Sequence, residues 1–143
     1  MFESILTVCD GNICRSPTAA ALLREQLPGR RIGSAGLVAL VDHDMAPLAR
    51  EVALAQGIDA GPHSARRLDG ALCREHDLIL VMEQRQRDEL MRRYPTVSGK
   101  VFLLSHWNGA QDIPDPWQKD REVYQAVFKL LQQACAAWLP KLA

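Results

Sequence analysis

The sequence predicts a single-domain α/β protein, a three-layer sandwich in which a four-stranded parallel sheet carries helices on both faces. Three observations support this prediction. Short apolar segments alternate with longer segments of helical periodicity, an order typical of parallel sheets. The chain has 143 residues, the size of one ordinary domain, and no linker or repeat divides it. Apolar residues make up 48% of it, enough for one core without disulfide or metal support.

Each element follows from a local pattern. The predicted strands are short apolar runs over residues 4–8, 31–35, 77–82 and 101–104. The predicted helices have apolar residues at helical spacing and cover residues 17–27, 45–56, 83–93 and 119–139. Pro17 suits the first position of its helix, where a backbone N–H group would have no partner. The buried stripe of the last helix is predicted to comprise Val123, Val127, Leu130, Leu131, Ala134 and Trp138.

The charge balance argues against a nucleic-acid-binding protein. Lys and Arg total 17 and Asp and Glu also total 17, whereas nucleic-acid binding needs a basic surface. The first residues lack the pattern of a signal peptide, and no window reaches the length of a membrane span. We therefore expect a cytoplasmic protein without membrane insertion. The cysteine spacing matches no zinc site. Four reduced thiols suit the cytoplasm, and the cysteines are Cys9, Cys14, Cys73 and Cys135.

The segment from Cys9 to Ser16 has the form C-x5-R-S and lies between a predicted strand and a predicted helix. Ligands of parallel sheets bind beyond the carboxyl ends of the strands, where this segment is expected. A loop around a phosphate can aim successive amide groups at its oxygens, and Gly11 allows the tight turn. The next helix adds its positive dipole end, and Arg15 can bind two oxygens at once.

The same donors stabilise a thiolate, so Cys9 is the candidate nucleophile, and the Ser16 hydroxyl can donate a hydrogen bond to its sulfur. The alternative is a buried cysteine at a strand end, followed by an ordinary turn. The position between a strand and a helix that starts near a proline favours the phosphate site.

The segment Val8–Pro17 resembles the signature loop of the low-molecular-weight protein tyrosine phosphatases. The similarity continues in order through Ser34-Ala35-Gly36, His63 with Ala65-Arg66, the strand 77–80 and Asp115-Pro116. It covers nearly the whole chain, so residues 1–143 are expected to form one phosphatase domain. The sequence most resembles the bacterial members associated with tyrosine kinases of exopolysaccharide export.

The resemblance implies hydrolysis of phosphotyrosine through a phospho-cysteine intermediate. Its implied substrate is a phosphotyrosine protein, a bacterial tyrosine autokinase, and its product is inorganic phosphate. No cofactor or metal is expected, because the loop and Arg15 neutralise the phosphate charge, and a monomer is the simple expectation. The implied catalytic residues are Cys9, Arg15 and Asp115, and Asp115 protonates the leaving phenolate and then activates water. On the residues alone, Asp115 would rather be a turn aspartate that caps the last helix.

The remaining site residues also follow from the resemblance. The phosphate-binding loop comprises Asp10, Gly11, Asn12, Ile13, Cys14 and Ser16. Ser34 and His63 are expected to hold Asn12, and Leu40 and Trp117 to line the substrate pocket. Cys14 is implied to form a reversible disulfide with the nucleophile, although it could equally be a packing residue.

Asp10 departs from the family, which mostly has an apolar or small residue directly after the nucleophile. A carboxylate there is expected to repel an anionic substrate. Trp117 and Gln118 stand where animal members have tandem tyrosines. Two other functions stay open. A thiol-type arsenate reductase needs two further cysteines close together, whereas Cys73 and Cys135 are far apart in sequence, and a phosphotyrosine-binding module would not need the catalytic residues.

Overall fold

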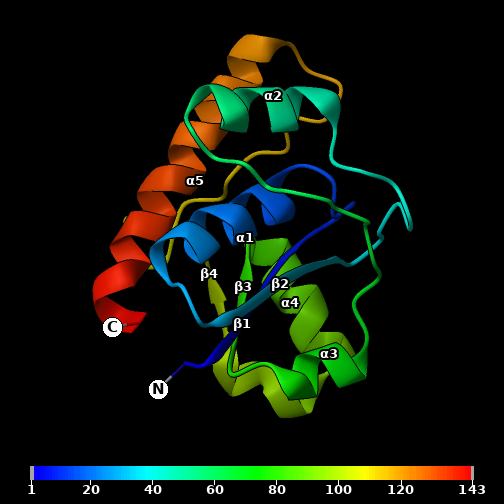
Figure 1. Cartoon of the computed structure of the whole chain (residues 1–143). Coiled ribbons are helices and arrows are strands. Elements are labelled where there is room, and N and C mark those ends of the chain that lie inside the picture. Colours follow the sequence, from blue (N-terminus) through cyan, green and yellow to red (C-terminus); the bar gives the residue numbers. More distant parts are fainter. Residues whose placement is uncertain (1, 143) are drawn as a thin grey trace.

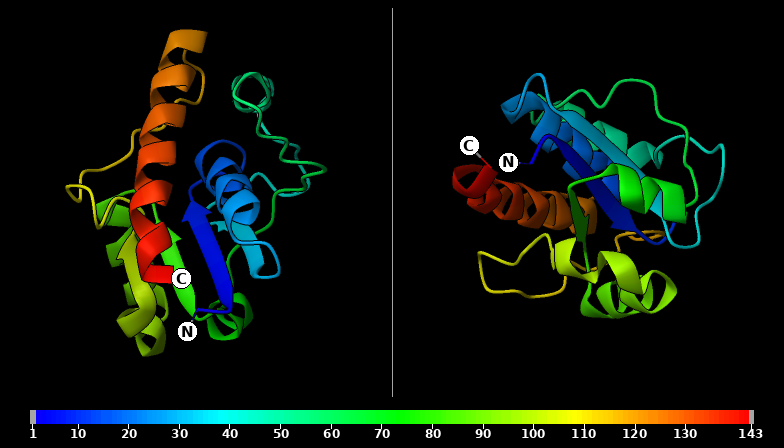
Figure 2. Two further views of the ribbon diagram at one scale, coloured as in Figure 1. Left: turned by 60° about the vertical axis from the view of Figure 1, so that its left-hand side comes forward. Right: turned by 90° about the horizontal axis from the view of Figure 1, so that it is seen from below.

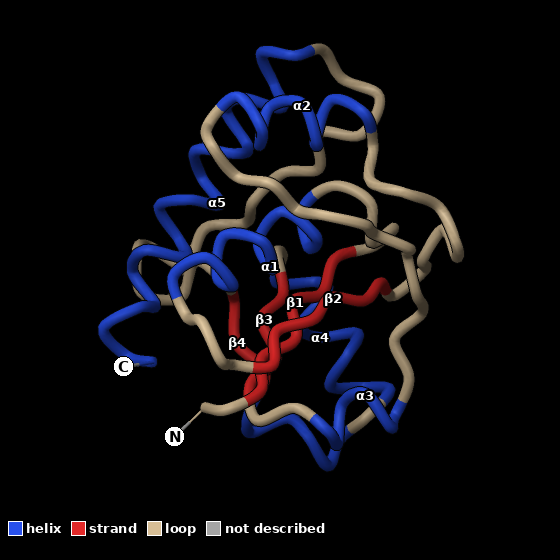
Figure 3. Tube along the Cα trace, in the orientation of Figure 1, coloured by secondary structure: helices blue, strands red, loops and turns tan. Residues whose placement is uncertain are grey.

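The computed structural model describes residues 2–142, which contain a four-stranded sheet with helices on both faces (Figure 1). The strands are β1 (Ser4–Cys9), β2 (Arg31–Gly36), β3 (Leu78–Val81) and β4 (Val101–Leu103). All pairs are parallel, in the order β2-β1-β3-β4. The strands lie in the middle of the molecule with helices around them (Figure 3). The predicted fold is therefore confirmed.

The strand register brings the carboxyl ends of the strands to one edge. Cys9 at the end of β1 lies opposite Gly36 at the end of β2, and Val8 lies opposite Val81 at the end of β3. Segments that follow β1, β2 and β3 therefore start side by side. This edge is where a parallel sheet binds ligands.

Two helical layers cover the sheet (Figure 2). One contains α1 (Arg15–Gln26) and α5 (Arg121–Leu142), and α2 (Pro47–Ala55) packs against both of them. The other contains α3 (Gly70–Glu75) and α4 (Gln84–Arg93), followed by the 3₁₀ segment η1 (Pro95–Lys100). Successive strand residues point to opposite faces, so the core is divided. Ile5 and Leu80 pack toward α1 and α5, while Leu6 and Val81 pack toward α3 and α4.

Helices α1 and α2 each begin two residues away from the predicted position. Helix α1 begins at Arg15, so Pro17 takes its third position; this is tolerated because the first four N–H groups of a helix have no partner within it. Helix α2 begins at Pro47 because the residue before a proline disfavours helical geometry, and Ala46 is extended with ψ of 134°.

Other differences concern α3 and α5. The short helix α3 was not predicted; Asp69 caps it by accepting a hydrogen bond from the Leu72 amide at 2.8 Å. Helix α5 continues through Pro140, which interrupts only its last turn. The prediction that Leu130 is buried is wrong, since this side chain lies on the solvent side of α5 and is 40% exposed. None of the helices in residues 2–142 has the length and apolar character required to cross a bilayer.

Candidate active site

Residues 10–14 connect β1 to α1 and form a loop whose carbonyl groups turn outward. The carbonyl oxygens of Cys9, Asp10, Gly11 and Ile13 accept hydrogen bonds of 2.9–3.0 Å from amides in the segment 37–46. Within the described chain, the amides of residues 11–14 are left without such partners. The first amides of α1 follow directly and are also free by helix geometry. The loop can therefore offer a run of N–H donors to an anion.

The Cys9 thiol lies on the floor of this loop, 2.9 Å from the Ser16 hydroxyl. The proton positions follow from Asn12. Its Oδ1 must accept the Arg66 amide proton at 2.9 Å, so its Nδ2 faces Ser16 and donates to the hydroxyl oxygen at 2.8 Å. The Ser16 proton is then free to point at the sulfur. Ser16 can therefore donate to Cys9, and such a bond favours a negatively charged sulfur.

Asn12 holds the loop in a conformation that few residues adopt. Its φ is +59°, in the left-handed region, and its side chain is fully buried. Nδ2 also donates to the Ser34 hydroxyl at 2.9 Å. His63 Nε2 lies 2.7 Å from the Asn12 carbonyl oxygen, which can only accept, so this nitrogen carries a proton. Burial lowers the pKa of His63 despite this bond, so the ring is neutral at neutral pH.

Arg15 is 1% exposed and is surrounded by carboxylates. Its Nη1 donates to Glu83 Oε2 at 2.6 Å and to the Ile113 carbonyl at 2.8 Å. Its Nη2 lies 3.6 Å from Asp10 Oδ2 and 3.7 Å from Asp115 Oδ2. One edge of the guanidinium is thus fixed to the protein, and the other edge stands between two carboxylates of the cavity wall.

A cavity of about 200 Å³ opens above Cys9. Asp115 enters it from the loop before α5, with a side chain 44% exposed, and its Oδ1 accepts the Trp117 amide at 3.0 Å. The walls also carry apolar side chains that an aromatic ring can contact. The lining comprises Cys9, Asp10, Gly11, Ile13, Cys14, Arg15, Val38, Leu40, Asp115 and Trp117. Asn12, Ser16, Ser34 and His63 lie behind the loop and support it.

Comparison with known proteins identifies the family of this chain. The profile described as "Low molecular weight phosphotyrosine protein phosphatase" matches residues 4–143. The chain belongs to this family. It is therefore a cysteine-dependent protein-tyrosine phosphatase, as the signature loop predicted.

Individual relatives of this phosphatase agree over nearly the full length. The probable low molecular weight protein-tyrosine-phosphatase AmsI of Erwinia amylovora is 44% identical over 143 residues, which is 100% of this chain and 99% of the relative. The crystal structure of the tyrosine phosphatase Wzb from Escherichia coli K30 with sulphate has a TM-score of 0.97 at 43% identity, with both chains covered completely. The arginine phosphatase YwlE from Geobacillus stearothermophilus has a TM-score of 0.91 at 34% identity, over 97% of this chain and 92% of that one.

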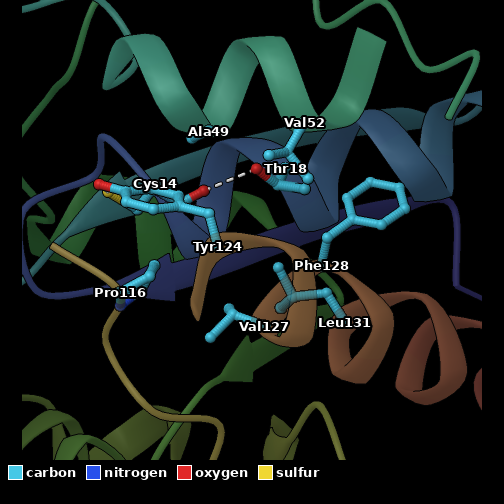
Figure 4. Close-up of a pocket in the computed structure, with 9 residues that line it drawn as sticks. All are labelled: Cys14, Thr18, Ala49, Val52, Pro116, Tyr124, Val127, Phe128 and Leu131. Atoms are coloured by element: carbon cyan, nitrogen blue, oxygen red, sulfur yellow. Dashed lines mark hydrogen bonds between the residues drawn. The ribbon is translucent and has the colours of Figure 1, made fainter. Parts of the chain in front are cut away.

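Cys14 lines the active-site cavity and also a small apolar cavity between α1, α2 and α5 (Figure 4). Its sulfur lies 3.6 Å from the Tyr124 hydroxyl. Burial raises the pKa of this thiol to about 12, so it stays protonated at neutral pH. Cys9 and Cys14 are both reduced in this structure.

The other two cysteines of the phosphatase lie outside the cavity. Cys73 packs in the core on the α3 and α4 side of the sheet, and Cys135 packs in the core on the α1 and α5 side. The sheet separates them from each other. They are not placed to form the relay of adjacent thiols that the arsenate reductase alternative requires.

Sequence reasoning missed four residues that border the site of this phosphatase. Val38 lines the cavity, Glu83 binds Arg15, and Arg85 and Gln86 contact the carboxylate of Asp10. Glu83, Arg85 and Gln86 follow β3 at its carboxyl end. Because β3 pairs with β1 in parallel, this end lies next to the loop that follows β1. That position was the available signal, because polar residues after a buried parallel strand are candidates for a site.

Proposed function

We propose that this phosphatase hydrolyses phosphotyrosine with Cys9 as nucleophile, Arg15 as phosphate ligand and Asp115 as acid and base. One observation carries the proposal. The Cys9 sulfur, 2.9 Å from the Ser16 hydroxyl, lies on the floor of a cavity that Arg15 and Asp115 also line. A nucleophile, an anion ligand and a proton donor therefore share one cavity of about 200 Å³.

In the first step, the Cys9 thiolate attacks phosphorus in line with the leaving oxygen. A sulfur–phosphorus bond forms as the bond between phosphorus and the phenolic oxygen breaks. Asp115, exposed at the cavity wall, donates its proton to the phenolate. The loop amides and the free edge of Arg15 bind the equatorial oxygens, where negative charge is concentrated in the transition state.

In the second step, water attacks the phospho-cysteine and Asp115 accepts its proton. The bond between phosphorus and sulfur breaks, and inorganic phosphate leaves. The electron pair returns to the Cys9 sulfur, where the Ser16 proton stabilises it. Asp115 ends this step protonated and ready for the next substrate.

The cavity walls support an aromatic leaving group. Ile13, Val38, Leu40 and Trp117 surround the entrance, and Trp117 is 43% exposed, so its ring is available for stacking. A phenol ring reaches across such walls, whereas phosphoserine is shorter. The proposed protein substrate is a bacterial tyrosine autokinase of exopolysaccharide export, which the resemblance to bacterial members supports. A monomeric cytoplasmic enzyme is part of the same proposal.

Phosphoarginine is a second candidate substrate, because the YwlE structure at 34% identity is that of an arginine phosphatase. The carboxylates of Asp10 and Asp115 at the cavity could face a guanidinium leaving group. The apolar walls favour the aromatic ring instead. A phosphotyrosine peptide and a phosphoarginine peptide of otherwise identical sequence separate the two: we expect a higher kcat/KM for phosphotyrosine.

The test of the proposed chemistry is hydrolysis of p-nitrophenyl phosphate in the presence of a metal chelator. Turnover should disappear in Cys9→Ser, and Asp115→Asn should lower kcat by about 10²-fold or more, the usual share of a general acid. The matched controls are Cys73→Ala, on the other side of the sheet, and Asp112→Asn. Asp112 accepts the Gln84 amide at 2.9 Å and does not line the cavity. Retention of activity in Cys9→Ser would contradict the proposal.

A further inference from the structure

The carboxylate of Asp10 is bound by two side chains of α4. Both terminal nitrogens of Arg85 donate to it, one of them to Oδ1 at 3.2 Å, and Gln86 Nε2 donates to Oδ1 at 3.1 Å. Asp10 is 22% exposed, whereas Arg85 is 62% exposed. Burial opposes ionisation of Asp10, but the bonds from Arg85 and Gln86 outweigh it and hold its pKa below the ordinary value. Asp10 is therefore ionised in a cavity meant for an anion.

Arg15 alone is poorly suited to bind a phosphate dianion, because carboxylates already surround it. Its guanidinium lies 2.6 Å from Glu83, 3.6 Å from Asp10 and 3.7 Å from Asp115. Three carboxylates thus surround one buried cation before a phosphate enters. Arg85 adds a second positive charge next to these carboxylates, since it contacts Asp10 and also lies 3.2 Å from Glu83.

We propose that Arg85 is a charge-compensating residue of the phosphate site: it neutralises Asp10, and thereby leaves the field of Arg15 and of the loop amides for the substrate phosphate. Arg85 acts through Asp10 and is a positioning residue rather than a catalytic one. The inference rests on the proposed function, because it concerns binding of the same phosphate. It assigns a role to Asp10, the departure from the family loop, and to an α4 residue that no loop motif includes.

A purely structural tie between the loop and α4 is the alternative. It makes a different prediction for KM, because a structural contact between Asp10 and Arg85 is lost when either residue is removed, and both variants should then change KM in the same direction. Charge compensation instead predicts opposite effects. Removal of Arg85 exposes the Asp10 carboxylate to the phosphate, whereas removal of the Asp10 charge leaves Arg85 as an additional cation at the entrance.

The experiment measures KM and kcat for p-nitrophenyl phosphate at low ionic strength. Arg85→Ala should raise KM about tenfold, equivalent to about 1.4 kcal/mol of binding, with kcat changed much less. Asp10→Asn should lower KM below that of the wild type, and the double variant should return close to the wild-type value. Arg85→Lys, which keeps the charge, should restore most of the affinity, and Arg85→Gln should not. Added salt should reduce the effect of Arg85→Ala because it screens charges.

The matched control is Arg92→Ala. Arg92 is 71% exposed on the same helix and pairs with Glu89, so its removal changes the net charge equally but away from the cavity. We expect no change in KM. The inference is overturned if Arg85→Ala leaves KM within about twofold of the wild type, or if the double variant stays as weak as Arg85→Ala, as expected of non-independent structural contacts.

A binding assay with inorganic phosphate separates this inference from the proposed function. If the wild type is inactive toward p-nitrophenyl phosphate, the proposed function fails, yet the affinity of each variant for phosphate can still be measured by calorimetry. The same order of affinities, with Asp10→Asn tightest and Arg85→Ala weakest, then supports charge compensation at an anion site. Equal affinities of all variants would overturn it.

Discussion

Asn12 has a fully buried side chain with three hydrogen bonds, and we expect its replacement by alanine to destabilise the protein by about 3–5 kcal/mol. The fully buried side chain donates to Ser16 and Ser34 and accepts from the Arg66 amide. Each such bond is worth roughly 1 kcal/mol net, with more lost where a buried partner stays unsatisfied. Alanine at a φ of +59° adds about 1 kcal/mol of backbone strain.

Urea unfolding of three variants separates these contributions. Asn12→Gly loses the same hydrogen bonds but tolerates the left-handed backbone, so it should be more stable than Asn12→Ala by roughly 1 kcal/mol. Ser34→Ala removes a single bond to Asn12 and should cost only about 1 kcal/mol. The stabilisation that inorganic phosphate gives to the wild type should shrink in Asn12→Ala, because the loop amides are then no longer held in place.

Two results would refute this reasoning. A loss below about 1 kcal/mol in Asn12→Ala would mean that the three bonds do not hold the loop. Equal losses in Asn12→Ala and Ser34→Ala would mean that the contact to Ser34 carries the whole effect and that the strained backbone is not supported by the other two bonds.

Three further predictions concern neighbours of the loop. Glu83→Ala should lower the free energy of unfolding by about 3 kcal/mol, because it leaves the buried Arg15 without its nearest carboxylate, and inorganic phosphate should recover part of this loss in urea unfolding. The lowered pKa of His63 means that the unfolded chain binds its proton first. The stabilisation from neutral His63 is therefore present above its unfolded pKa of about 6.5 and is lost as the pH falls from there through the lowered pKa of the folded state. His63→Gln should flatten the decline in melting temperature between about pH 7.5 and 5.5. Peroxide should inactivate Cys14→Ala irreversibly if Cys14 protects Cys9, and full recovery with a thiol reagent would count against that role.

The fold could be predicted because its elements depend on local patterns. The apolar run after Asp77 matches a strand buried on both faces, and β3 covers Leu78–Val81. Local patterns fail where tertiary contacts decide the outcome. The stripe of α5 predicted Leu130 to be buried, but its side chain is exposed to solvent. The six residues of α3 are too few to show a period.

The site residues also divide into those that a local motif predicts and those that depend on tertiary contacts. The proposed nucleophile, the proposed anion-binding loop and Arg15 lie in one continuous segment, so a single motif predicts all three. Glu83 and Arg85 are about seventy residues away, and the sequence gives no measure of their distance from the loop. Only the order of the strands, with β3 next to β1, shows that the start of α4 borders the loop. Asp115 is assigned as the acid through the resemblance alone, because an aspartate between two prolines has no property that identifies an acid.

A substitution at Gly36 tests how rigidly the loop after β1 is held against the sheet, because this residue lies where the two meet. It ends β2 opposite Cys9, and its amide and carbonyl bind Arg66 and Leu68. A methyl group on Gly36 would overlap the carbonyl oxygen of Asp10 and lie 3.1 Å from Ala39 Cα. Both obstacles are backbone atoms that cannot move without displacing the loop.

Gly36→Ala should therefore weaken phosphate binding and lower stability together, by about 2 kcal/mol or more in urea unfolding, because overpacking against a fixed backbone strains both. Gly99→Ala is the matched control, since a methyl group there meets no atom within 4 Å. If Gly36→Ala bound inorganic phosphate as tightly as Gly99→Ala, the loop would be able to shift away from β2 without cost. The rigid attachment of the loop to the sheet, on which the placement of Cys9 and Arg15 depends, would then be wrong.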